Sequence, residues 1–96
     1  MKIILNNQTN KYTKEKFFQT ITKLKDDEGI YYKFKDSEYS SVIYRVLEDC
    51  YIDFYEGHLF PKAYDGLDEL KKEVNYWPFF KTFEVVKVKD ITIQLK

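Results

Sequence analysis

Few residues in this sequence are of the kinds that build metal sites, disulfides or phosphate-binding loops. Cys50 is the single cysteine, so no disulfide can form within the chain. One cysteine and one histidine, His58, are too few for a structural zinc site, which uses four ligands, chiefly of these two types. The three glycines are too widely spaced for a glycine-rich phosphate loop. We therefore expect no metal and no cofactor.

Long apolar runs are also missing. The apolar run at 3–5 is too short for a signal peptide, and no run reaches the roughly 18 residues that a membrane helix needs. A lone cysteine gives no sign of secretion, so we expect a cytoplasmic protein with no membrane partner. A chain of 96 residues has room for one hydrophobic core. We expect residues 1–96 to form a single domain.

Neither sign of charge dominates, because 16 basic and 16 acidic residues cancel. This balance argues against a duplex-DNA-binding protein, which normally has a basic excess. The charges are segregated, since residues 1–25 are mainly basic and residues 26–78 mainly acidic. Among the basic residues only Arg45 is an arginine, and Lys, Asn, Ile, Tyr and Phe far outnumber Gly, Ala, Arg and Pro. Such usage is typical of AT-rich coding DNA and points to a low-GC bacterium or one of its phages.

Two segments have the apolar periodicity of helices. Thr13 can cap a helix that extends to about residue 25. Gly29, a few residues later, is suited to the left-handed conformation that follows a helix. Asp65 can cap a second helix, which Pro78 ends. We expect the two helices to place one apolar stripe against a sheet, formed by Phe17, Ile21, Leu24, Leu67, Leu70, Val74 and Trp77.

Alternating apolar residues, and a run that is apolar on both faces, predict the strands. Three consecutive strands are expected at 30–35, 39–47 and 50–56. Their connections of two to three residues allow only antiparallel neighbours. Further strands are expected at 2–6, 80–89 and 90–96, the last two as a hairpin. The order β-α-β-β-β-α-β-β predicts an α+β fold, in which two helices pack on one face of an antiparallel sheet in two layers.

The sheet face away from the helices is the predicted binding surface. In strand 50–56 the alternation favours Cys50, Ile52 and Phe54 as core residues and leaves their neighbours for that other face. The predicted binding residues are Tyr31, Lys33, Arg45, Tyr51, Asp53, Tyr55, Phe83 and Val85. Tyrosine, arginine and apolar side chains concentrate binding energy in interfaces. The same set would also suit single-stranded nucleic acid, and an apolar patch of this kind allows a homodimer.

The sequence contains no recognisable catalytic motif. Cys50 is expected to be a buried, unreactive thiol. Asp49 and Asp53 lie too far apart along a strand to share a metal ion, and Glu56 points to the other face. We therefore expect a small binding protein that is not an enzyme, of the type that phages and mobile elements use to inhibit or modulate a host protein, such as anti-defence or anti-CRISPR inhibitors. A single-stranded nucleic-acid-binding module is the alternative, and a small toxin-like nuclease comes third.

Overall fold

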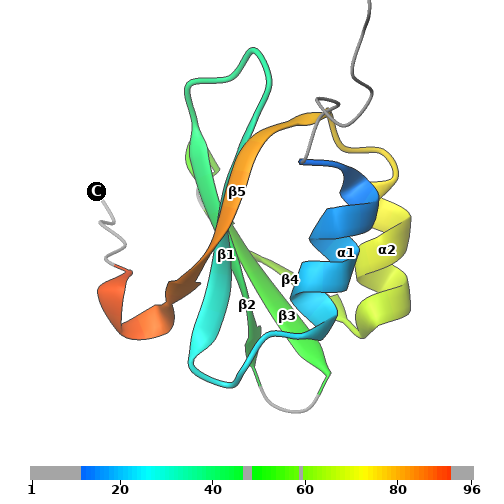
Figure 1. Cartoon of the computed structure of the whole chain (residues 1–96), viewed down its shortest axis with the longest axis vertical. Coiled ribbons are helices and arrows are strands. Elements are labelled where there is room, and N and C mark those ends of the chain that lie inside the picture. Colours follow the sequence, from blue (N-terminus) through cyan, green and yellow to red (C-terminus); the bar gives the residue numbers. More distant parts are fainter. Residues whose placement is uncertain (1–11, 47–48, 59, 92–96) are drawn as a thin grey trace, which may run out of the picture.

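A computed structural model describes residues 12–46, 49–58 and 60–91, and it shows a two-layer α+β fold (Figure 1). In chain order the elements are α1 (Lys14–Thr22), β1 (Glu28–Phe34), β2 (Ser40–Val46), β3 (Cys50–Tyr55), β4 (Lys62–Asp65), α2 (Leu67–Val74), β5 (Phe80–Lys87) and the 3-10 helix η2 (Val88–Asp90). The strands form one antiparallel sheet in the order β4-β3-β2-β1-β5. Both helices lie on the same side of it. The predicted fold class is confirmed, and so is the antiparallel meander of β1, β2 and β3.

Helix α1 begins where the sequence predicts it. Thr13 has an extended backbone, and its Oγ1 accepts a hydrogen bond of 3.1 Å from the backbone N–H of Lys16. The helix ends at Thr22, about three residues earlier than expected. Leu24, in the segment that follows, is nevertheless buried, so the apolar stripe continues past the last helical turn.

Helix α2 ends at Val74, earlier than the end predicted just before Pro78. Two further predictions about helix ends are wrong, both at glycine or its neighbour. Asp65 is the last residue of β4, and the left-handed Gly66 (φ 105°) precedes α2 in its place. The backbone N–H of Asp65 donates to the Glu69 carboxylate at 2.9 Å. Gly29 lies inside β1, where a Cβ would stand 2.9 Å from the carbonyl oxygen of Ile43. Close approach of β2, and not a left-handed turn, is what requires glycine there.

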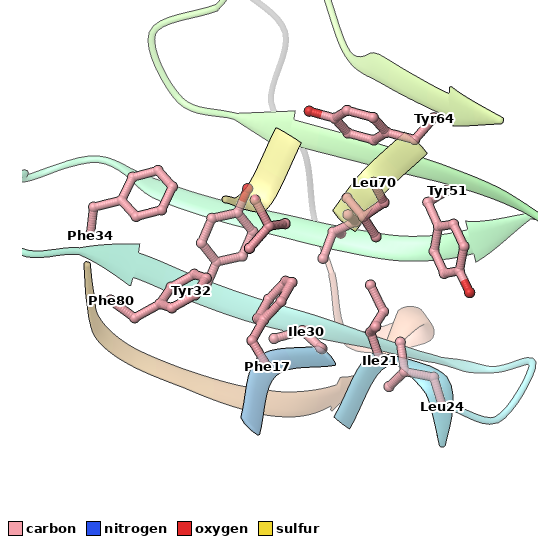
Figure 2. Close-up of a cluster of buried hydrophobic side chains, with 12 residues drawn as sticks. Phe17, Ile21, Leu24, Ile30, Tyr32, Phe34, Tyr51, Tyr64, Leu70 and Phe80 are labelled. Carbon is pink, nitrogen blue, oxygen red and sulfur yellow. The ribbon is translucent and has the colours of Figure 1, made fainter. Parts of the chain in front are cut away.

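The core fills the space between the helices and the sheet (Figure 2). Figure 2 shows Phe17 and Ile21 projecting from α1 toward the sheet, and the rings of Phe17 and Phe80 stack with centroids 4.7 Å apart. The predicted stripe is confirmed: five of its members are buried, and Leu67 and Trp77 pack against the core while remaining partly exposed. An aromatic side chain of this kind buries on the order of 150–250 Å². Aromatic rings therefore supply much of the core of this small fold.

The predicted terminal strands differ in how far the described residues cover them. The strand predicted at 2–6 lies outside the described residues, as does most of the strand predicted at 90–96. Strand β5 ends at Lys87, and η2 occupies the position at which the predicted hairpin of 80–89 and 90–96 would turn, so no hairpin turn lies there. Strand β5 pairs with β1. The described helices are all too short or too polar to cross a membrane.

Candidate binding site

The pairing of the strands separates the residues that the sequence places on one face. Ile30 and Tyr32 of β1 are fully buried in the core beneath the helices. Side chains alternate along a strand, so Tyr31 and Lys33 point to the opposite, helix-free face, as predicted. The hydroxyl of Tyr31 forms a hydrogen bond of 2.6 Å with Oγ of Ser40 on that face.

Strand β3 has the opposite alternation to the one predicted. Asp53 pairs with the fully buried Ile43 of β2, and Arg45 pairs with Tyr51. Paired residues share a face, so Tyr51, Asp53, Tyr55 and Arg45 all lie on the helix side. The prediction that they face away from the helices is wrong. The alternation misleads because the helix-free face of β3 is also apolar, and Asp53 is accommodated in the core by a hydrogen bond.

Phe83 and Val85 of β5 also lie on the helix side, contrary to prediction. Phe83 pairs with Tyr32 and Val85 with Ile30, and both partners are core residues. Phe83 packs against the core, whereas Val85 is 45% exposed at the edge of the sheet. The predicted binding residues therefore do not form one surface. That Arg45 and the others contact a partner stays a prediction for each residue separately.

The helix-free face itself has a different make-up from the one predicted. Besides Tyr31 and Lys33 it carries apolar residues of β2 and β3, namely Val42, Tyr44, Ile52 and Phe54. The rings of Tyr44 and Phe54 stack with centroids 5.9 Å apart. Arg45 is not on this face and instead pairs with Asp26 at 2.6 Å. Of the two basic residues in the predicted set, only Lys33 remains there, which makes a poor platform for a phosphate backbone.

The largest exposed apolar side chains gather elsewhere, at one end of the sheet. They are Tyr39 (52% exposed), Phe60 (76%), Tyr76 (89%) and Phe79 (70%). These residues belong to the β1–β2, β3–β4 and α2–β5 connections. In an antiparallel sheet of this strand order the three connections emerge at the same end, which is uppermost in Figure 1. We call these four residues the aromatic end.

A pocket of about 230 Å³ opens on the helix side of the sheet next to the aromatic end. The aromatic pocket is lined by Tyr32, Phe34, Asp53, Tyr55, His58, Lys62, Tyr64 and Trp77. The ring of Tyr55 joins the two features, since its centroid lies 6.0 Å from that of Tyr39 and 4.8 Å from that of His58. Tyr32 and Trp77 stack at 5.4 Å and form one wall.

Asp53 is the buried acid of the aromatic pocket, with only 7% of its surface exposed. Its Oδ1 accepts a hydrogen bond of 2.6 Å from the Tyr32 hydroxyl. Burial raises the pKa of Asp53 to about 6, although this hydrogen bond and the nearby Lys62 both act to lower it. Burial, together with the Asp53 charge, also raises the pKa of the Tyr32 and Tyr64 hydroxyls, so both stay protonated. The pocket thus combines a carboxylate with hydroxyl donors.

Lys62 is the natural partner for Asp53, but its ammonium group binds elsewhere. The two residues pair across β3 and β4 and share a face. The Nζ atom of Lys62 forms an ion pair of 3.2 Å with Glu73 of α2 and lies 5.4 Å from the centre of the Tyr64 ring. Asp53 therefore has no ion pair within the described part of the chain. A buried carboxylate without a counter-charge costs folding free energy, which makes this position a candidate for function.

The groups around Asp53 that could take part in proton transfer or nucleophilic attack are few among the described residues. A carboxyl with a raised pKa can act as a general base when it lies within hydrogen-bond reach of the proton that it removes. His58 contacts the ring of Tyr55, and no hydrogen bond joins it to Asp53 among the described residues. The described lining residues include no serine, threonine or cysteine that could serve as a hydroxyl or thiol nucleophile.

Comparison with protein-family models, curated proteins and solved structures finds no match to this chain. Sequence reasoning missed the aromatic pocket because it placed Asp53 on the wrong face and gave the segment containing β4 no strand. A usable signal was nevertheless present: the predicted meander already brings the loops after β1 and β3 to the same end of the sheet.

Proposed function

We propose that this protein acts by binding another protein, without catalysis, and that the partner docks on the aromatic end and the aromatic pocket. In its biological setting it would be a phage or mobile-element accessory protein that inhibits or modulates a host protein. The observation that carries the proposal is the exposure of Tyr39, Phe60, Tyr76 and Phe79 in connections at one end of the sheet, beside a pocket. A single exposed apolar side chain is ordinary, but four large ones at the same end of a small fold suit an interaction surface.

The chemistry of this surface supports a protein partner. Tyrosine, phenylalanine and tryptophan are enriched in protein interfaces, and a central pocket surrounded by such rings is where hot spots occur. Lys14 adds a basic group at the rim, since its Nζ lies 5.7 Å from the centre of the Phe79 ring. The helix-free face is a weaker candidate for the docking surface, because none of its residues is among the exposed large apolar side chains.

A capture experiment with two matched variants tests the proposal. One variant, Phe60→Ser with Phe79→Ser, alters the aromatic end, and the other, Tyr31→Ala with Lys33→Ala, alters the helix-free face. Circular dichroism and tryptophan emission verify that both fold. After a partner has been captured from host lysate and purified, we expect the first variant to bind it at least about tenfold more weakly, as loss of interface anchors does. The second variant should bind like the unaltered protein.

Two results would contradict the proposal. The docking surface is wrong if the Tyr31 and Lys33 variant loses the partner while the Phe60 and Phe79 variant keeps it. The partner class is wrong if the purified protein carries nuclease-sensitive absorbance at 260 nm and captures no protein, because the single-stranded nucleic-acid alternative then applies.

A further inference from the structure

The aromatic pocket contains a carboxylate that forms no ion pair within the described part of the chain. Asp53 faces it with one oxygen, Oδ1, bonded to Tyr32. Ser41 Oγ is the one side-chain polar atom among the described residues that is sealed from solvent and lacks a partner. The second oxygen of Asp53 is therefore not sealed, and it remains open to a group that enters the pocket. The nearest described cation, Lys62, is already paired with Glu73.

The walls of the pocket suit a positive charge. The face of an aromatic ring attracts a cation within about 6 Å of its centre, most strongly when water is excluded. The rings of Phe34, Tyr55 and Trp77 line the pocket, and the Phe34 and Trp77 centroids are 5.5 Å apart in an edge contact. The chain itself uses this chemistry at the pocket margin, where the Lys62 ammonium lies over the Tyr64 ring.

We infer that the aromatic pocket binds a cationic side chain of the protein partner, a lysine or an arginine, with Asp53 as its counter-ion and the aromatic rings as its walls. The inference deepens the proposed function and rests on it, because the partner supplies the cation. The volume agrees with this occupant: about 230 Å³ is below the roughly 300–1,000 Å³ typical of small-molecule sites and suits a single side chain.

Titration of the isolated protein with n-butylammonium and n-butylguanidinium tests the inference without any partner. Trp77 is the only tryptophan in the chain and lines the pocket, so its fluorescence reports occupancy. At pH 8 and low salt we expect saturable binding with a Kd of about 1–10 mM, since a ligand of so few atoms gains only a few kcal/mol. The neutral n-butanol and the anionic butyrate should bind at least about tenfold more weakly. The tighter of the two cations identifies the side chain.

Two carboxylate variants separate the pocket from the rest of the surface. Asp53→Asn keeps the shape of the side chain and removes its charge, and we expect it to weaken n-butylammonium binding at least about fivefold. Asp65→Asn is the matched control. Asp65 is an exposed residue of the adjacent strand β4 and pairs with Cys50. It therefore lies on the helix-free face, and its loss should leave binding unchanged.

Binding should also decrease in acid, as Asp53 takes up a proton. Several titratable or charged groups line the pocket with Asp53: Tyr32 from β1, Lys62 and Tyr64 from β4, and His58 from the loop after β3. Glu73 of α2 pairs with Lys62. His58 is a second titratable residue in the pocket. The titration is therefore repeated with His58→Gln, which should retain the loss of binding below about pH 6 if Asp53 is responsible.

The inference is overturned if n-butanol binds as tightly as n-butylammonium, or if Asp53→Asn binds the cation as well as the unaltered protein. Failure here leaves the proposed function intact, because a partner could still dock on Phe60 and Phe79. Conversely, the capture experiment can fail while the isolated pocket still binds n-butylammonium. The two outcomes are thus distinguishable.

Discussion

Replacing Asp53 by asparagine should stabilise the fold at neutral pH. The pKa of this carboxyl rises from its ordinary value of 3.8 to about 6 on folding. At about 1.4 kcal/mol per pH unit, ionised Asp53 lowers the free energy of unfolding by roughly 3 kcal/mol. Asparagine cannot ionise, and its side-chain oxygen can still accept the hydrogen bond from Tyr32. Since domains of this size have about 5–15 kcal/mol of stability, the gain should be easy to measure.

The stability that Asp53→Asn gains over the unaltered protein should depend on pH. Well below pH 3.8 the carboxyl is protonated in both the folded and unfolded chain, so the Asp53→Asn variant and the unaltered protein should be equally stable. Between pH 3.8 and about 6 the unfolded chain releases its proton first, so the stability of the unaltered protein falls as pH rises. Above about pH 6 the loss is complete. The advantage of Asp53→Asn should therefore develop across this interval and stay constant above it.

Urea unfolding followed by Trp77 emission, at pH 4, 6 and 8, measures this difference. The control is Asp65→Asn, an exposed carboxylate whose loss should change stability by no more than about 0.5 kcal/mol at any of these pH values. The reasoning is refuted if Asp53→Asn is less stable than the unaltered protein at pH 8, or if its effect is the same at all three pH values. Either result would mean that ionised Asp53 is stabilised by contacts that outweigh its burial.

Two further substitutions test the packing. Gly29→Ala should lower the free energy of unfolding by about 1–3 kcal/mol, because the new Cβ meets the Ile43 carbonyl oxygen at 2.9 Å; a variant with unchanged urea midpoint would show that β2 can move aside. Trp77→Ala should cost about 2–4 kcal/mol, toward the lower part of the range for large aromatic truncations because Trp77 is only partly buried. An unchanged melting temperature would show that Trp77 does not contribute to the packing of the core.

The sequence predicts the elements of this fold better than it predicts their faces. The helix that Thr13 caps and the three strands of the meander follow from local patterns, and the structure confirms them. Strand β4 has only four residues, and a proline precedes it in the chain. Its formation depends on pairing with β3 across the sheet edge, which no local pattern encodes. The sequence therefore provides no indication of it.

The sequence does not show which side of each strand faces the helices, because both sides of this sheet are apolar. Along β3, Ile52 and Phe54 alternate with Tyr51 and Asp53, and a rule that places the more apolar set inside selects the wrong side. A shift of one residue exchanges the two faces of a strand. Long-range contacts decide which residues of β3 face the helices. Asp53 is opposite Ile43, and it bonds to the hydroxyl of Tyr32, twenty-one residues away in the chain.

That long-range contact also explains how a carboxylate can occupy the helix side of the sheet. The Tyr32 hydroxyl binds one of its oxygens, which reduces the cost of burial without removing the charge. Lys62 could have neutralised the charge from the adjacent strand, but Glu73 of α2 holds its ammonium group at 3.2 Å. An uncharged side chain at position 53 would serve stability better. An unpaired carboxylate in an open aromatic pocket is therefore costly in the free protein, and a cation from a bound partner would recover that cost at the moment of binding.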